Sequence, residues 1–354
     1  MSHGSTRVAL HAALAALGVV VVVNGFGIAA NDAGLIDIGL AAVAPAAAAP
    51  GGHGGPVATT GKIADRGSSA EPAAVVAAQS ATQSPAQSPA QSPATLPGGR
   101  STVFGGGRFL VAYYGTAGTG ALGVLGKTSP AKMQRQLHRA GKSFARAGRP
   151  VQLVYELIVT IADRHPGKDG DFSHDINRKQ VRPYLRAAHR NDALLLLDIQ
   201  PGHADFLSVA KRWRWALADP WVGLALDPEW RMSGHDVPGR VIGHVGAGEV
   251  NRTSAWLARL VARDHLPQKL FVLHQFRTAM IRHIDRVKAR PGLAMVQHVD
   301  GFGTPGEKKQ TFHAVVRPRR FVLGFKLFYQ VDIHRMSARQ VVKLRPRVRF
   351  VSYQ

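Results

Sequence analysis

The stretch that decides the fold is "LALDPEWR", residues 224–231. It opens with three apolar residues, and two carboxylates, Asp227 and Glu229, follow at once, with Trp230 after them. A strand that is apolar on both faces is typical of a parallel sheet covered by helices. The fold therefore depends on whether other apolar runs of the chain end in polar side chains in the same way.

Seven further apolar, β-rich runs lie after residue 106, at 108–115, 151–160, 193–202, 269–276, 293–301, 320–329 and 348–354. Most of the segments between them have helical patterns, at 129–148, 177–190, 206–219, 248–265, 278–290 and 337–344, with a weaker helical signal between 301 and 320. Alternating strands and helices predict a parallel sheet. Eight such strands in about 250 residues predict an α/β protein with a (β/α)8 TIM-like barrel.

An open, doubly wound sheet is the alternative fold. It would place a glycine-rich phosphate loop after the first strand. Gly115, Gly118 and Gly120 follow that strand, but they do not have the G-x-G-x-x-G order, and no acidic ribose ligand follows. These glycines are better explained by a tight turn in the first loop.

Polar or phenolic side chains end the apolar runs, at the end of each strand where a barrel carries its active site. They are Tyr113, Tyr114, Glu156, Asp198, Gln200, Asp227, Glu229, His274, His298, Asp300, Lys326 and Tyr329. Because residues two apart in a strand share a face, we expect Asp227 with Glu229, Asp198 with Gln200, and His298 with Asp300 to face the barrel mouth together. Structural ion pairs with Lys326 or Arg231 are the alternative explanation.

The chemistry that these side chains suggest is glycoside hydrolysis. The chain has no cysteine, no G-x-S-x-G and no H-E-x-x-H, which argues against serine, cysteine and zincin-type hydrolases. We expect Glu229 to be the general acid, with its pKa raised by Asp227, and Asp300 to be a further catalytic carboxylate. No cofactor and no metal are expected. The expected substrate contacts are Tyr113, Tyr114, Glu156, Asp198, Gln200, Trp230, His274, His298, Lys326 and Tyr329; for Trp230, core packing is an equal alternative.

The D-P-E of residues 227–229 is similar to the D-x-E of TIM-barrel glycosidases such as bacterial muramidases and chitinases, in which the glutamate is the general acid. Two departures are present. Gly223 and Ala225 stand where the longer chitinase motif has acids, and tyrosines end the first strand where the muramidases have an aspartate. The wider pattern, with "YYG", "LDIQPG", "LALDPEWR" and a terminal "FVSYQ", resembles a family of exported actinobacterial proteins without an assigned activity. That resemblance covers residues 108–354 and implies the barrel and export.

The N-terminal third has the composition of an export signal and a spacer. Arg7 precedes an apolar run at residues 8–23, so residues 1–30 are expected to be a signal peptide or, if uncleaved, a signal anchor. Residues 31–106 are expected to be a low-complexity linker, because they are rich in Ala, Pro, Gly, Ser and Gln and contain "QSPAQSPAQSPA". The barrel domain is expected at residues 107–354, secreted or in the cell envelope.

The net charge of +23 lies entirely after residue 106, since the first 106 residues have as many acidic as basic side chains. Such a field favours a polysaccharide or another anionic cell-wall polymer as partner. The absence of a nucleic-acid-binding motif argues against DNA or RNA, and a membrane contact is expected only through an uncleaved N-terminal segment. Two other functions stay open. One is a non-catalytic glycan-binding barrel, and the other is a metal-dependent phosphodiester hydrolase using Glu156, Asp198, Asp227, Glu229 and both histidines.

Overall fold

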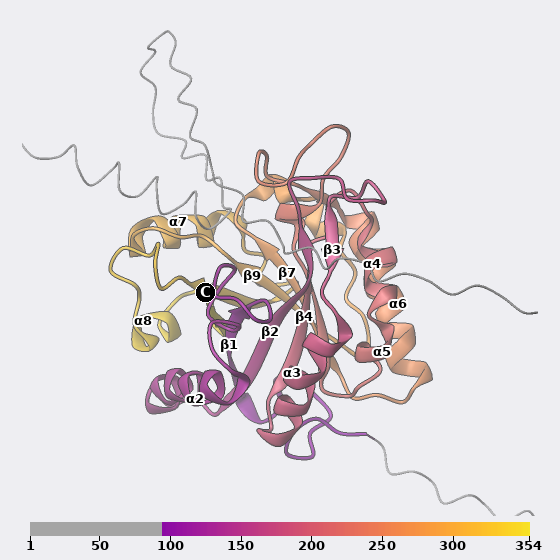
Figure 1. Ribbon diagram of the computed structural model, residues 1–354. Coiled ribbons are helices and arrows are strands. Elements are labelled where there is room, and N and C mark those ends of the chain that lie inside the picture. The colour runs from indigo at the N-terminus through magenta and orange to yellow at the C-terminus, as the bar shows by residue number, and fades with distance from the viewer. Residues whose placement is uncertain (1–93) are drawn as a thin grey trace, which may run out of the picture. The chain divides into compact units, whose positions relative to one another are not determined.

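A closed barrel of eight parallel strands forms the centre of the computed structural model, which describes residues 94–354 (Figure 1). Around the barrel the strands follow one another in chain order, and β1 pairs with both β2 and the last strand, β11. The barrel strands are β1 Phe109–Gly115, β2 Val151–Ala162, β4 Leu194–Ile199, β5 Val222–Leu226, β7 Lys269–Gln275, β9 Leu293–Val299, β10 Val322–Leu327 and β11 Val348–Tyr353.

All eight predicted strands are present in the structure, which confirms the (β/α)8 TIM-like barrel. The open doubly wound sheet is wrong, because the pairing of β1 with β11, for example Leu110 with Phe350, closes the sheet. A short strand β3, Ser173–Asp175, adds to the end of β2 in antiparallel orientation. Two-residue strands β6 (Val245–Gly246) and β8 (Ile281–Arg282) pair in the loops.

Seven helices of the described chain surround the barrel (Figure 1). They are α2 Pro130–Arg146, α3 Arg178–Arg190, α4 Phe206–Arg212, α5 Arg214–Leu217, α6 Ala247–Arg263, α7 Pro305–Val315 and α8 Ala338–Val342. Several begin at sequence signals for helix starts: α3, α7 and α8 each begin with a capping box, and α2 has Pro130 in its first turn.

The helix predicted at 278–290 is wrong. This segment holds two 3-10 turns, Thr278–Met280 and Ile284–Arg286, with β8 between them. His283 adopts a left-handed backbone conformation with φ 56°, which a continuous helix cannot accommodate. In contrast, the segment with the weak helical signal contains α7. Its apolar stripe is interrupted by Lys308, which is fully buried and pairs with Asp332 at 2.9 Å.

Two apolar layers are separated by the barrel wall. The outer layer packs the outward side chains of the strands against the helices. The inner layer fills the lower half of the barrel with side chains such as Leu110, Val154, Leu196, Val272 and Phe350. Successive inward residues are two apart along each strand, as the pleat requires.

Residues 94–106, which fall within the predicted linker, pack against the barrel. Leu96 and Val103 are buried in the inner apolar layer. The indole Nε1 of Trp221 donates to the carbonyl of Thr95 at 2.8 Å, and the amide of Gln268 donates to the carbonyl of Ser101 at 3.0 Å. The predicted signal and the rest of the predicted linker lie outside the described residues. Within residues 94–354, no helix combines the length and apolar character that a membrane span needs.

Candidate active site

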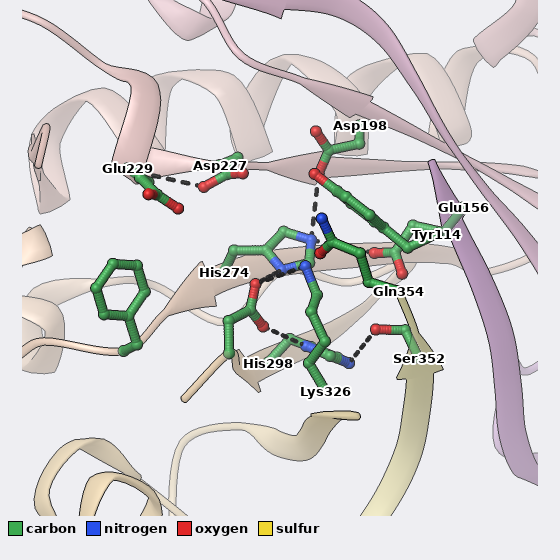
Figure 2. A network of polar contacts seen from close by, with 12 residues as sticks. Tyr114, Glu156, Asp198, Asp227, Glu229, His274, His298, Lys326, Ser352 and Gln354 are labelled. Carbon is green, nitrogen blue, oxygen red and sulfur yellow. Dashed lines mark hydrogen bonds and ion pairs between the residues drawn. The ribbon is translucent and has the colours of Figure 1, made fainter. Parts of the chain in front are cut away.

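A ring of polar side chains continues the inward-facing positions of the barrel beyond its apolar half. In each strand, the last inward-facing apolar or glycine residue is followed, two positions later, by a polar residue that also faces inward. These residues are Tyr114, Glu156, Asp198, Asp227, His274, His298, Lys326 and Ser352, one from the end of each of the eight strands. Neighbouring strands set them side by side, as in the direct register of His274 with His298 and of Lys326 with Ser352. Figure 2 shows these side chains converging from the surrounding strands.

Asp300, two residues after His298, is the centre of a buried charge network. Its Oδ2 lies 2.7 Å from Nδ1 of His274 and 2.8 Å from Nζ of Lys326. Its Oδ1 lies 2.7 Å from Nδ1 of His298. The second ring nitrogen of His298, Nε2, lies 3.3 Å from Oγ of Ser352 (Figure 2). Both oxygens of Asp300 are thus occupied by nitrogen atoms of its neighbours.

His274 is held in the imidazolium form, because both of its ring nitrogens face carboxyl groups. Nε2 lies 3.0 Å from Oε1 of Glu156 and 3.2 Å from Oδ2 of Asp198. Burial alone would lower the pKa of His274, but the charge of Asp300 and the hydrogen bonds raise this pKa well above its usual value. Conversely, burial would raise the pKa of Asp300, but His274 and Lys326 hold it well below its usual value.

Glu156 and Asp198 both face the single N–H at Nε2 of His274, and their pKa values shift in opposite directions. Burial raises the pKa of Asp198, and the adjacent charge of Glu156 adds to the rise. For Glu156, burial would also raise the pKa, but the hydrogen bond from His274 and the positive charges around it together lower the pKa. The shorter hydrogen bond goes to Glu156, and neither oxygen of Asp198 has a well-aligned hydrogen bond. Of the two, Glu156 is therefore the more readily ionised, and Asp198 is the one that takes up a proton first as the pH falls.

Lys326 connects this network to the cavity above it. Its side chain is only 4% exposed, and its Nζ lies 3.7 Å from the ring centroid of Tyr114. Burial would lower the pKa of Lys326, but Asp300 and Glu156 together raise it, so the ammonium ion is retained. Alternating charges of Glu156, His274, Asp300 and Lys326 thus compensate each other inside the barrel, which lowers the cost of burying each one.

The D-P-E segment is a turn rather than the end of a strand. β5 ends at Leu226, and residues Pro228–Trp230 form a 3-10 turn that Asp227 caps by accepting the amide of Glu229 at 3.2 Å. The expectation that Asp227 and Glu229 share a strand face is therefore wrong, because both residues lie beyond the end of β5. Pro228 has no N–H to extend the ladder, so the chain turns after Leu226. The backbone N–H of Gly243 donates a hydrogen bond of 2.6 Å to the carbonyl of Glu229, and this bond holds the turn in place.

Both carboxyls of this turn keep their protons to a higher pH than ordinary carboxyl groups do. Burial, with the neighbouring charge of Asp198, raises the pKa of Asp227 to about 7. Burial, with the neighbouring charge of Asp227, raises the pKa of Glu229 to about 8. Among the described residues, no side chain or amide donates a hydrogen bond to the carboxyl of Glu229. The partly buried Glu229 carboxyl is therefore available to a ligand as a proton donor.

A cavity of about 1030 Å³ opens above the network. Of the predicted site residues, those that line it are Tyr113, Tyr114, Gln200, Asp227, Glu229, Trp230, Asp300, Lys326 and Tyr329. The sequence also placed Glu156, Asp198, His274 and His298 among the substrate contacts. These four are fully buried and do not line the cavity, so their burial assigns them to the support of its floor.

Two groups of cavity residues escaped the sequence analysis. Phe276, Phe302 and Phe328 line the cavity one, three and one residues after β7, β9 and β10, and inclusion of the apolar residues at the strand ends would have found them. Lys127 and, from α2, Lys132 and Arg139 line the opposite part of the wall. Their position on the cavity wall depends on how α2 is oriented against the barrel, which the sequence pattern does not show. Tyr113 points its hydroxyl to that of Tyr329 at 3.1 Å, so these two predicted contacts act as one aromatic pair.

The residues that could hold a metal ion are the groups Glu156, Asp198, His274 and His274, His298, Asp300. His274 belongs to both groups, and each of its ring nitrogens lies within hydrogen-bonding distance of a carboxylate, an arrangement that favours the imidazolium form. An imidazolium ring has no free lone pair for a metal. The ammonium of Lys326 also occupies Oδ2 of Asp300. The donor set as arranged thus fits an ion-pair network rather than a cation site.

The comparisons with known proteins add no relative. No protein-family model matches the chain, and no curated protein is significantly similar to it in sequence. The resemblance to glycosidases and to exported actinobacterial proteins therefore stays a prediction.

Proposed function

We propose that this barrel hydrolyses a glycosidic bond of an extracellular polysaccharide, with Glu229 as the general acid. The observation that carries the proposal is the placement of Asp227 and Glu229 in one rigid turn at the wall of a large cavity lined by aromatic side chains. A carboxyl that is protonated at neutral pH and faces a ligand is what protonation of a leaving sugar oxygen requires.

Asp227 is the second carboxyl of the proposed reaction. With pKa values of about 7 and about 8, the Asp227–Glu229 pair holds a single proton near pH 7.5. In that state one carboxyl is an acid and its neighbour is an anion that stabilises a developing positive charge on the sugar ring. Asp300 was expected to be catalytic as well. Because both of its oxygens are occupied by His274, His298 and Lys326, its proposed role is to hold the floor ionised and rigid.

Export and a wall polysaccharide as substrate belong to the same proposal. They are supported by the apolar run at residues 8–23, by the spacer composition after it and by the net charge of +23. The non-catalytic and the metal-dependent alternatives differ from the proposal in measurable ways, since only the proposed hydrolase needs a proton on Glu229 and tolerates a chelator.

The test is the release of reducing ends from purified cell-wall glycans by the wild-type chain and by the variant Glu229→Gln. Removal of a general acid is expected to lower kcat by about 10²- to 10⁴-fold. Asp163→Asn is the matched control, because Asp163 also lines the cavity but is an exposed group paired with His174. Equal activity of Glu229→Gln and wild type, or no release from any glycan by the wild type, would contradict the proposal. A loss on addition of chelator would favour the metal-dependent alternative instead.

A further inference from the structure

Two neighbouring helices, α2 and α3, carry many positive charges and no negative one. α2 contains five lysines and arginines, and α3 contains another five, with no aspartate or glutamate in either helix. The ten residues are Lys132, Arg135, Arg139, Lys142, Arg146, Arg178, Lys179, Arg182, Arg186 and Arg190. All ten are exposed, and α2 and α3 are in contact (Figure 1). We call this surface the α2–α3 basic face.

None of the ten side chains forms an ion pair with a described residue. Their inward neighbours, such as Met133, Leu137 and Phe144 of α2 and Val181 of α3, bury the apolar side of each helix. On α3 the basic residues recur every four positions, from Arg178 to Arg190, which places like charges one above another and destabilises an isolated helix. Arg178 and Arg182 are ordered instead by the ring of Trp215, with their guanidinium carbons 5.2 and 5.7 Å from its centroid.

The other long helices do not share this composition. α6 carries Glu249 and α7 carries Glu307 among their basic residues. Arg212, the arginine at the end of α4, is paired with Asp171 and Asp175. The overall positive charge therefore does not by itself explain a face without any acidic residue.

The basic face is continuous with the cavity. Lys132 and Arg139 belong to α2, and they line the cavity together with Lys127 from the preceding loop. α2 connects β1 to β2, whereas Asp227 and Glu229 follow β5, which is three strands from β1 and two from β2 around the barrel. The acidic turn and the basic wall thus occupy different parts of the same cavity wall, and a chain-like ligand that leaves the cavity over α2 meets the basic face.

The geometry points to a polymer-binding surface. The α2–α3 basic face binds an anionic polysaccharide, one whose sugars carry carboxylate or phosphate groups, and guides it into the cavity. The choice of a polysaccharide rests on the proposed function of the cavity, while the choice of an anionic polymer rests on the ten unpaired cations. Nucleic acid and anionic lipid would need no such connection to a cavity that bears a carboxyl pair.

The experiment measures binding by the full-length chain carrying Glu229→Gln, so that turnover does not interfere. The probes form two pairs, each of an anionic polymer and its neutral form. Polygalacturonate and its methyl ester test for carboxylate, and phosphorylated dextran and dextran test for phosphate. A triple variant, Arg135→Gln, Arg186→Gln and Arg190→Gln, removes three charges of the basic face outside the cavity. The matched control removes three exposed and unpaired charges from α6 and α7, with Arg252→Gln, Arg259→Gln and Lys309→Gln.

We expect at least one anionic polymer to bind at low salt and its neutral partner to bind more weakly. The basic-face triple variant is expected to weaken that binding by about tenfold, and the control triple by less than about twofold, with the difference shrinking as salt rises. Equal losses in the two triples, binding of no anionic polysaccharide, or tighter binding of duplex DNA or of phosphatidylglycerol vesicles through the same arginines would each overturn the inference. Hydrolysis of short neutral glycans reports separately on the proposed function, because the basic-face triple leaves the cavity intact.

Discussion

The Nδ1 atom of His274 lies 2.7 Å from the Oδ2 atom of Asp300 inside the barrel, where the side chain of His274 is 1% exposed. Through its other nitrogen the same ring contacts Glu156 and Asp198, so one imidazolium connects three carboxyl groups from three other strands. Loss of one partner from a buried charge network leaves the others without compensation, which costs more than the pair contributes.

Replacement of His274 should therefore destabilise the whole barrel. We expect His274→Asn to lower the free energy of unfolding by about 3 to 5 kcal/mol, the range for a broken buried ion pair. The matched control is His174→Asn, which removes an equally short contact of 2.6 Å to Asp163 in a pair with side chains 55% and 38% exposed. Its expected effect is below about 1 kcal/mol. Urea unfolding followed by circular dichroism measures both, and similar losses for the two variants would contradict the network.

The proposed reaction should have a narrow pH optimum. Activity needs a proton on Glu229, whose pKa is about 8, and an ionised Asp227, whose pKa is about 7. The rate is expected to rise as the pH passes about 7 and to fall as it passes about 8. The dependence of kcat/KM on pH tests this for the free enzyme. A rate that stays constant from pH 5 to pH 10 would remove both carboxyls from the reaction.

Asp227→Asn should move the alkaline limb of that profile. Burial is the main cause of the raised pKa of Glu229, and the charge of Asp227 is the second. The amide keeps a side-chain oxygen that can accept the hydrogen bond from the Glu229 amide, but it removes the charge, so the pKa of Glu229 should fall. The residual activity of the variant is then expected to decline at a lower pH than that of the wild type. A limb that stays at the wild-type position would show that the two carboxyls are not coupled.

The same two carboxyls should cost stability at alkaline pH. Their pKa values are raised from 3.8 and 4.5 in the unfolded reference to about 7 and about 8. The folded chain therefore holds more protons than the unfolded chain between about pH 4 and pH 8, and stability falls as the pH rises through that window.

We expect the double variant Asp227→Asn, Glu229→Gln to be more stable than the wild type at pH 9, by on the order of 2 kcal/mol. At about pH 2.5, below both reference pKa values, both carboxyls are protonated in the folded and in the unfolded chain, so the two proteins should be nearly equal in stability. Thermal melts at the two pH values give the measurement. A difference of the same size at both pH values would indicate a packing effect instead of a charge effect.

Much of the barrel could be predicted because its strands are local features of the sequence. An apolar run such as residues 222–226 is recognisable without knowledge of its neighbours, and the repeat of eight runs implies closure. α7 was harder to recognise, since its buried Lys308 is compensated by Asp332, which lies far along the chain. The turn at Pro228 was missed because alternation was extended past the end of β5.

The sequence pattern predicted which residues gather at the candidate site, but not which of them line the cavity and which lie buried below it. The rule that polar strand ends meet at one mouth brought Glu156, Asp198, His274 and Asp300 together correctly. Which of them lie beneath the floor depends on the tilt of the strands and on side-chain packing, and neither can be derived from spacing. The charges of Lys132 and Arg139 on the cavity wall depend on the rotation of α2 against the barrel, a tertiary property.

The ring of one inward polar residue from each strand also checks the assembly of the barrel. A shift of any strand by one residue reverses its faces. In β7 such a shift would replace His274 with Leu273 or Gln275, so Glu156 would lose its hydrogen-bond partner and Asp300 would lose one of its three. Misassembled registers are therefore penalised by the same contacts that shape the cavity floor, so the most stable arrangement of the eight strands is also the one in which the site is complete.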